Sequence, residues 1–577
     1  MLKTPYPLVR WLAAWLGAAS TLFAQDAVPD AIFHSGKIIT VDSNFAVHEA
    51  FAVKGGRIVA VGSTAVIRAL AQANTPQHDL RGKAVLPGLI DSHVHAPAAA
   101  MFEFDHEIPS METIREVLDY IAARTKVVPE GEWIQTQQVF ITRLKEERFP
   151  TRAELDAVAP KHPVSFRTGP DNMLNTLGLA RCGFDRSFAV KDGGSGYLEK
   201  DAGGELTGLA RGLSRLIHVG SGRRPTDADH SRRIQELFRD YNQIGITAVA
   251  DRGATPESIV RYEKLRERGE LTVRMAMSQT FPIVGSMESI LGAIDQIAAS
   301  PLRREDGWLK LIGTKVWLDG GMLTGSAYML KPWGRNEKYG ILDDNYRGVL
   351  NIPPDRLLEM VRRVAKRGMQ FTAHSVGDGA VTELLRAYEI VDREHPIRDL
   401  RMAVTHSNFM TRELVEKSAK LGVVLDIQPI WLFLDTRTLV NQFGYDRLRY
   451  FQPLRSILAA GGRTGGGSDH MLKIGDMRAI NPYNPFHAMW VTITRSAKWY
   501  EGKLHPEEAL TRRQAIEFYT RNNAYLIFWE KELGSLEPGK RADFIVVDRD
   551  LLTCAENDIK DTRVLQTWLE GRKVFER

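Results

Sequence analysis

Two histidines separated by a single residue stand at the end of an apolar run. His93 and His95 close the segment AVLPGLIDSHVH (84–95). Residues i and i+2 of a strand point to the same face, so both imidazoles would project from one side of it. Imidazole nitrogen is a common ligand of divalent metal ions, zinc above all. The pair is therefore a candidate metal site, although one such histidine alone is more often an ordinary packed residue.

Three further potential ligands occupy the same place in other strand-like runs. His374 ends MQFTAH, His406 ends RMAVTH, and Asp469 follows the glycines of TGGGSD. In a barrel of parallel strands, the chemistry gathers where the carboxyl ends of several strands meet. We therefore expect four histidines and one aspartate to lie together in one barrel mouth.

Lys315 adds a reactive group to this set. In WLKLIGTKVWLDGG (308–321) it alternates in phase with apolar residues, so it would point into the barrel, where an unpaired ammonium is costly. Desolvation lowers the pKa of a lysine and yields a neutral amine that can react with carbon dioxide. The resulting carboxylated lysine has two oxygens that can bridge two metal ions. The same position also fits a buried lysine paired with Asp469 or Asp319.

The elements that must position these residues alternate between strand-like and helix-like runs. The helix-like segment 354–368, for example, places its apolar residues with the 3.6-residue period. Repeated β-then-α units predict a parallel sheet covered by helices, and eight strands predict a (β/α)8 barrel. The eight expected strands are 84–95, 246–253, 271–278, 308–321, 369–375, 400–407, 421–429 and 462–469.

The remaining segments predict an α/β chain with additions to the barrel. Residues from about 100 to 240 are too many for a loop and contain their own strands, EWIQTQQVF and PVSFRTG, so they predict an inserted α+β subdomain after the first barrel strand. Short β-rich runs with glycine turns at both chain ends predict one flanking β-sandwich. The expected organisation is a signal peptide (1–24), sandwich segments (25–83 and 529–577) and the barrel (84–528).

The N-terminus is typical of an export signal. Lys3 and Arg10 precede an uncharged run, WLAAWLGAASTLFA, that ends at Ala24. This run is shorter than the ~20 apolar residues of a membrane span. We expect cleavage after Ala24 and a periplasmic or secreted protein with no stable membrane span. A retained N-terminal anchor is the alternative.

Composition limits the classes of partner. Apolar residues make up 44% and charged residues 25%, which is typical of a globular protein. The formal charge of +5 falls by two with the signal, and no dense basic block argues for nucleic acid, so a small molecule is the expected partner. A homo-oligomer is compatible with these features. Cys182 and Cys554 lack zinc-finger spacing and are expected to be unpaired thiols.

Motifs in a fixed order extend this interpretation to a family. The segments DSHVH, GTKVWLDGG, AHSVGDGAV, THSN and GGGSDH resemble the amidohydrolase superfamily and, within it, the amidohydrolase-3 (YtcJ-like) group. GKAVLPGLIDSHVH and LGSLEPGKRADFIVVD extend the resemblance over nearly all of the chain after the signal. The resemblance implies a (β/α)8 barrel, a flanking β-sandwich and one or two divalent metal ions, usually zinc. It implies these ligands: His93, His95, His374, His406, a carboxylated Lys315, and Asp469.

The resemblance also implies a reaction. A bound metal ion lowers the pKa of water from about 15.7 toward about 7, and Asp469 would be the general base and then the acid for the leaving nitrogen. The expected reaction is hydrolysis of a non-peptide C–N bond, as in an N-acyl or N-formyl amine. Hydrolytic deamination or cyclic-amide opening at the same site, and a barrel that only binds or regulates, are the alternatives.

Three positions carry separate expectations. After Asp469 the chain has His470-Met471 where a small residue and proline are more usual in the family, which would alter the rim of the site. Segment TGPDNMLNTLGL (168–179) lacks the family's histidine and aromatic pair before its asparagine. Asp91, two residues before His93, fits either a group that orients a ligand or a turn residue.

Overall fold

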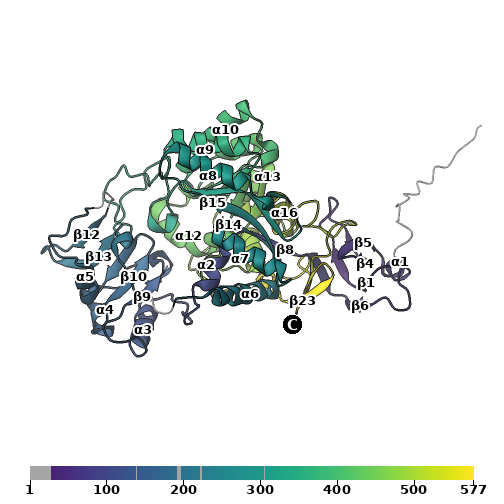
Figure 1. The fold of residues 1–577 in the computed structure, drawn as a ribbon, viewed down its shortest axis with the longest axis horizontal. Coiled ribbons are helices and arrows are strands. Elements are labelled where there is room, and N and C mark those ends of the chain that lie inside the picture. Colours follow the sequence, from purple (N-terminus) through teal and green to yellow (C-terminus); the bar gives the residue numbers. More distant parts are fainter. Residues whose placement is uncertain (1–27, 138, 192–195, 221–223, 305) are drawn as a thin grey trace, which may run out of the picture.

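The computed structural model describes residues 28–137, 139–191, 196–220, 224–304 and 306–577 (Figure 1). The expected export signal, residues 1–24, lies outside the described residues. In Figure 1 the barrel occupies the centre, with a small sheet-and-helix subdomain on one side and a β-rich region formed by both chain ends on the other. Within the described ranges, no helix combines the length and the apolar character needed to cross a bilayer.

Eight parallel strands form one sheet and confirm the predicted barrel. Every strand expected from the sequence is present. In order around the sheet they are β8 (Leu89–Val94), β14 (Ile246–Ala254), β15 (Arg274–Thr280), β16 (Leu309–Trp317), β17 (Gln370–Ser375), β18 (Ala403–His406), β19 (Val424–Ile427) and β20 (Arg463–Gly466). The last strand returns to the first through a parallel bridge between Val94 and His470.

The first expected strand, 84–95, is two strands in two different sheets. β7 (Ala84–Pro87) pairs with sandwich strands, and β8 begins the barrel. Gly88 lies between them, donates its N–H to the carbonyl of Asp543 over 2.9 Å, and has no room for a side chain because a Cβ would lie 2.2 Å from Thr247 Oγ1. The apolar run is continuous in sequence because both strands are buried.

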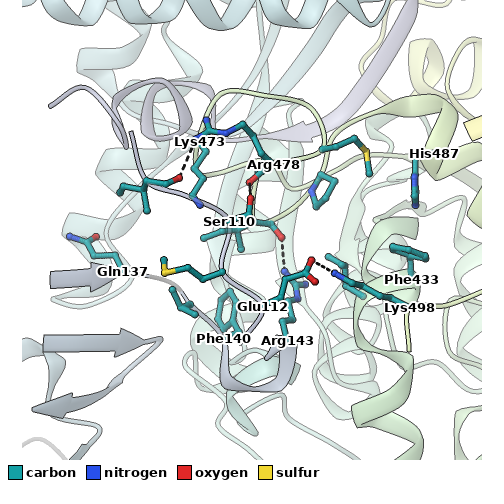
Figure 2. A pocket seen from close by; sticks show the side chains of 18 residues that line it. Ser110, Glu112, Gln137, Phe140, Arg143, Phe433, Lys473, Arg478, His487 and Lys498 are labelled. Carbon is teal, nitrogen blue, oxygen red and sulfur yellow. Dashed lines mark hydrogen bonds and ion pairs between the residues drawn. The ribbon is translucent and has the colours of Figure 1, made fainter. Parts of the chain in front are cut away.

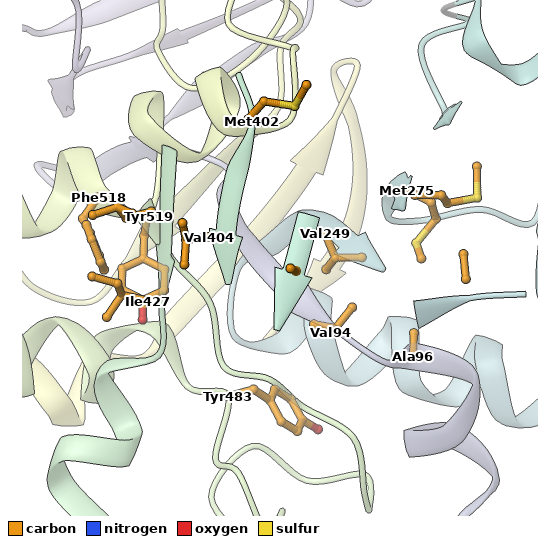
Figure 3. Packing of buried hydrophobic residues seen from close by; sticks show 14 of the residues in the cluster. Val94, Ala96, Val249, Met275, Met402, Val404, Ile427, Tyr483, Phe518 and Tyr519 are labelled. Atoms are coloured by element: carbon orange, nitrogen blue, oxygen red, sulfur yellow. The ribbon is translucent and has the colours of Figure 1, made fainter. Parts of the chain in front are cut away.

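Helices cover the outside of the barrel and complete its largest core. The predicted helix 354–368 corresponds to α9 (Pro354–Lys366), whose buried residues include Leu357, Val361 and Val364. Figure 3 shows part of the same core, with Val94 and Val249 on neighbouring strands. The other covering helices include α6 (Asp227–Gln243), α7 (Pro256–Glu267), α8 (Met287–Ala298), α10 (Asp378–Glu394) and α11 (Arg412–Leu421).

The two chain ends form the predicted β-sandwich. One sheet has the order β5-β4-β1-β6, and the other has the order β23-β22-β21-β7-β2-β3. Aromatic rings fill the space between them: Phe33 stacks on Phe51 with ring centroids 4.8 Å apart, and Phe544 stacks on Trp568. The strands are β1 (Ala31–His34), β2 (Lys37–Ile39), β3 (Val47–His48), β4 (Ala50–Lys54), β5 (Arg57–Gly62), β6 (Gln77–Asp79), β21 (Phe544–Val547), β22 (Val564–Leu569) and β23 (Arg572–Glu576).

The insertion between β8 and β14 is an α+β subdomain, as predicted. Its five-stranded sheet has the order β12-β13-β11-β10-β9. It meets the barrel through Thr142 and Arg143, which contact α12 (Pro429–Phe443): Thr142 O accepts a hydrogen bond from Thr438, and Arg143 forms an ion pair with Asp435. The elements are α3 (Ile114–Arg124), β9 (Ile134–Gln137), α4 (Arg152–Val158), β10 (Val164–Thr168), β11 (Asp171–Leu174), α5 (Thr176–Cys182), β12 (Tyr197–Lys200) and β13 (Leu206–Arg211). Both cysteines lie in described segments, and neither forms a disulfide.

Candidate metal centre

Three potential metal ligands meet where the barrel closes. His93 on β8 and His95 directly after it have Nε2 atoms 3.3 Å apart. Asp469 Oδ1 lies 3.3 Å from His93 Nε2 and 3.2 Å from His95 Nε2. Two imidazole nitrogens and one carboxylate oxygen are a donor set that suits Zn²⁺. Their mutual approach, with all three ligand atoms within 4.8 Å of one another, leaves room for one shared ion.

The glycines before Asp469 allow this meeting. A Cβ on Gly467 would lie 2.7 Å from His93 Cβ, and a Cβ on Gly466 would lie 2.5 Å from the ring of Phe518. The chain after β20 therefore passes against β8 with no space for side chains. The backbone N–H of Asp469 then donates to the carbonyl of His93 over 2.8 Å. Asp469 itself has a left-handed φ of 55°, which turns its carboxylate toward the histidine pair.

His374 and His406 lie on the other side of the barrel mouth. His374 is on β17 and His406 ends β18, and their ring centroids are 4.4 Å apart. His406 also stacks near His93, with centroids 5.0 Å apart. Burial lowers the pKa of His406 well below its usual range and that of His374 to about 3, so both rings are neutral at pH 7, the state that binds metal.

Lys315 is fully buried on β16, facing these groups. Its exposed fraction is 0%, and among the described residues no atom forms a hydrogen bond with Nζ. Burial lowers its pKa to about 7, an effect that the charges of Asp469 and Asp426 oppose. The pairing with Asp319 that the sequence also allowed is not seen, because Asp319 accepts the backbone N–H groups of Val376 and Gly377.

The five ligand candidates and Lys315 have the donor atoms that a divalent metal ion requires. Four imidazoles, one carboxylate and a buried amine with no hydrogen-bond partner among the described residues are gathered at one barrel mouth. A buried polar atom without a partner is uncommon in a native protein and indicates a missing group, and a carboxylate added to Lys315 Nζ would be a further metal ligand. The residues therefore fit one or two divalent ions.

Comparison with known proteins agrees with this geometry. A model described as the amidohydrolase family matches residues 78–575. The chain belongs to the amidohydrolase family. It is 28% identical to an N-substituted formamide deformylase of Arthrobacter pascens, over 95% of this chain and 98% of the relative. It is 22% identical to the putative amidohydrolase YtcJ of Bacillus subtilis (strain 168), over 95% and 99%.

A solved structure supports the fold. A metal-dependent hydrolase of Pyrococcus horikoshii OT3 superposes with a TM-score of 0.68 at 20% identity, covering 91% of this chain and 99% of that one. The family predicted from the motifs is thus confirmed, and membership supports a metal-dependent hydrolase. The roles of the individual residues stay predictions.

In this amidohydrolase, one residue of the seventh barrel strand, β19, and the residue directly after that strand orient the histidines, and sequence reasoning missed both. His93 Nδ1 donates to Asp426 Oδ2 over 3.0 Å, and His406 Nδ1 donates to Gln428 Oε1 over 2.7 Å. Each bond fixes the tautomer that leaves Nε2 free to bind metal. The available signal was the i, i+2 spacing of Asp426 and Gln428 in LGVVLDIQP, which places both on one face of the strand.

Asp91 and His470 support the backbone around the ligands. Asp91 Oδ1 accepts the N–H of His93 over 2.9 Å and that of Ser468 over 3.1 Å, so it holds the two converging segments rather than an imidazole. His470 is buried, its Nδ1 lies 2.8 Å from the hydroxyl of Tyr241, and its Nε2 lies 2.6 Å from the carbonyl of Lys473. It is therefore packed beneath the site, not placed on its rim.

The rim of the amidohydrolase site has two further groups. Trp431 on α12 stacks on His406 with ring centroids 4.8 Å apart, and its indole N–H is buried and without a hydrogen-bond partner in the described part of the chain. Asn481 donates to the carbonyl of Asp469 over 2.8 Å and lies 3.3 Å from its Oδ2. Trp431 thus has a free donor, and Asn481 fixes the orientation of the carboxylate.

Proposed function

We propose that the protein hydrolyses a non-peptide C–N bond of a small amide, such as an N-acyl or N-formyl amine. The observation that carries this proposal is the convergence of His93, His95 and Asp469 in the same barrel mouth as Lys315, which is buried and has no hydrogen-bond partner among the described residues. The similarity to an N-substituted formamide deformylase supports the choice of an amide as substrate. Zinc is the proposed metal because the donors are imidazole and carboxylate.

Lys315 would hold the metal as a carbamate. Its neutral Nζ attacks the carbon of carbon dioxide, a C–N bond forms, and one N–H proton passes to solvent. The product has two carboxylate oxygens in place of one buried amine. Its negative charge suits the neighbouring neutral histidines once a cation is bound. His93, His95, His374, His406 and Asp469 would supply the other ligands.

The bound metal would supply a water of lowered pKa and polarise the substrate carbonyl. Asp469 would accept the proton of the attacking water at a carboxylate oxygen and return it to the leaving nitrogen, which breaks the C–N bond. Asn481 would keep the carboxylate in one orientation during both transfers. The Trp431 N–H, which points from a ring already fixed against His406, would donate a hydrogen bond to bound substrate.

A screen of N-acylated and N-formylated amines tests this function. We expect the zinc-loaded wild type to release amine plus acid, and His374→Ala and Asp469→Asn to lose that activity. His395→Ala is the matched control, because it removes an exposed histidine after α10. If His374→Ala and Asp469→Asn both matched the wild type, the assignment of the site would be wrong. Release of ammonia instead would indicate a deaminase.

We also propose that the chain is exported. The support is the charged start and the uncharged run that ends at Ala24. The mass of the mature protein from the native host tests this, with residue 25 as the expected new N-terminus. A full-length mass would contradict cleavage.

A further inference from the structure

A cavity of about 340 Å³ lies between the inserted subdomain and the barrel (Figure 2). Three parts of the chain form its wall: the insertion, α12 and the segment after β20. They contribute Ile108, Ser110, Glu112, Gln137, Val139, Phe140 and Arg143 from the insertion, Phe433 and Leu434 from α12, and Lys473, Arg478 and Ile480 after β20. Its size is within the range of small-molecule sites. The cavity exists only because the insertion is present, so it belongs to this chain's additions rather than to the barrel alone.

Two hydrogen bonds connect this cavity to Asp469. Arg143, which lines the cavity, donates to Asn481 Oδ1 over 3.0 Å and to the carbonyl of Ile480 over 2.8 Å. Asn481 in turn lies 3.3 Å from Asp469 Oδ2. In the proposed reaction Asp469 gives its proton to the leaving nitrogen. A substituent on that nitrogen that extended past Asn481 would reach the cavity wall at Arg143 and Ile480.

The cations that line the cavity differ in how they are neutralised. Arg143 forms an ion pair with Asp435 at 2.8 Å, Arg478 with Glu103 at 2.8 Å, and Lys498 with Glu112. Lys473 pairs with no carboxylate within 4.0 Å among the described residues, and its Nζ donates to the carbonyl of Pro109 over 2.8 Å.

Glu103 and Glu107 favour the ammonium of Lys473 only from a distance. Lys473 is only 3% exposed, so solvent compensates little of its charge, and one carbonyl uses one of its three donors. Burying a charged ammonium without an adjacent opposite charge is costly. A ligand carboxylate beside Lys473 would be attracted to it strongly, because the site is partly buried. In Figure 2, Lys473 and Arg478 lie on the opposite side of the cavity from Phe433, His487 and Lys498.

The rest of the wall suits an apolar group. Phe140 and Phe433 line it, and the ring of His487 packs edge-on against Phe433 with centroids 4.7 Å apart. Burial lowers the pKa of His487 to about 4, so this ring is neutral at pH 7. Its buried Nε2 has no hydrogen-bond partner within the described segments. A ligand with an aromatic or aliphatic body therefore finds apolar contacts between the two polar sides.

We propose that this cavity binds the amine part of the substrate, and that this part is an apolar group bearing a carboxylate that Lys473 recognises. The substrate class is then an N-acyl or N-formyl amino acid or a similar acid, rather than an uncharged amide. This inference rests on the proposed function for the choice of the bond that is cleaved. Lys473 is in this account a specificity-determining residue that takes no part in the proton transfers.

Two ligands that differ only in the carboxylate test the proposal. N-formylphenylalanine, as both enantiomers, is compared with N-formylphenethylamine by calorimetric binding to the wild-type chain freed of metal, so that Asp469 is intact and binding is measured without turnover. We expect N-formylphenylalanine to bind at least about tenfold more tightly than N-formylphenethylamine. Lys473→Met should abolish that preference, and the affinity for N-formylphenethylamine should stay within about twofold of the wild-type value. Lys473→Arg should retain part of the preference because it keeps the charge.

The control for net charge is Lys126→Met, also freed of metal, which removes an exposed lysine of the inserted subdomain. It should leave the preference unchanged. Equal affinity of the two ligands, binding of neither, or a preference that survives Lys473→Met would overturn the proposal. Hydrolysis of both ligands by the zinc-loaded wild type is assayed in parallel. That activity together with no carboxylate preference would refute the specificity alone, whereas a carboxylate preference without any amide hydrolysis would refute the proposed function alone.

Discussion

The two sides of the candidate metal centre differ in how completely the chain assembles them. On the β8 side, His93, His95 and Asp469 already have their ligand atoms within 4.8 Å of one another. On the β16 side, Lys315 Nζ has no hydrogen-bond partner among the described residues, and His374 Nε2 lies 3.3 Å from the carbonyl of Gly320.

The difference has a structural cause. The β8 side is fixed by the backbone bond from Asp469 to His93 and by glycines that bring two strands into contact. In the proposed account, the β16 side is completed by a modification, a carboxylate on Lys315. We infer that the β8 side binds an ion on its own and that the β16 side is completed by carbon dioxide and a second ion.

Asp469→Asn should have the largest effect, because it removes both a ligand of the β8 side and the proposed proton acceptor. We expect kcat/KM to fall by about 10³-fold or more, since a general base alone contributes about 10² to 10⁴. Steady-state kinetics on a hydrolysed amide measures this. Asp399→Asn, at an exposed position, is the control. Retention of a tenth of the activity would contradict the role of Asp469.

Lys315→Ala should break only the β16 side. Loss of an outer partner of a ligand already costs about 10- to 100-fold, so loss of the bridging ligand should cost more than about 100-fold in activity. We expect elemental analysis to show fewer ions per chain but not zero, and added acetate to restore part of the activity by replacing the carbamate. Unchanged metal content and activity would show that Lys315 is a structural lysine.

Asp426→Asn should weaken the β8 side without dismantling it. The amide cannot match the charge that the carboxylate presents to His93 Nδ1, so we expect the Kd for the tighter ion to rise by about 10- to 100-fold. Competition with a chelator of known affinity measures the change. If only the Kd for the weaker ion rose, Asp426 would not support the β8 side of the metal centre.

Trp431→Phe should have the smallest effect, because it keeps an aromatic ring beside His406 while it removes the indole N–H and part of the ring. A lost hydrogen bond is worth about 0.5–1.5 kcal/mol, which corresponds to about threefold to tenfold in kcat/KM. The metal content should not change. If kcat/KM were also unchanged, the N–H would have no role in binding substrate.

Much of this arrangement could be predicted from the sequence because barrel strands are local and periodic. Each of the eight strands ends an apolar run, and the polar residue at each end marks the barrel mouth. The i, i+2 register of His93 and His95 follows from strand geometry alone, and their approach in the structure agrees with it.

The contacts that the sequence did not reveal are long-range. Asp426 bonds a histidine more than 300 positions earlier, and nothing near LDIQP indicates that partner. The change of sheet at Gly88 was hidden because residues on both sides of it are equally buried. The burial of His470 depends on Tyr241 from α6, which no local pattern places beside it.

The most direct test of the account is the metal content of His93→Ala beside that of the wild type, both loaded with zinc in bicarbonate and then freed of excess metal. The β8 side is predicted to hold the tighter ion. The wild type should therefore retain at least one zinc per chain, and His93→Ala should lose the tightly bound one, whereas His395→Ala should match the wild type. A wild type without zinc, or a His93→Ala protein with as much zinc as the wild type, would contradict the metal centre proposed for this chain.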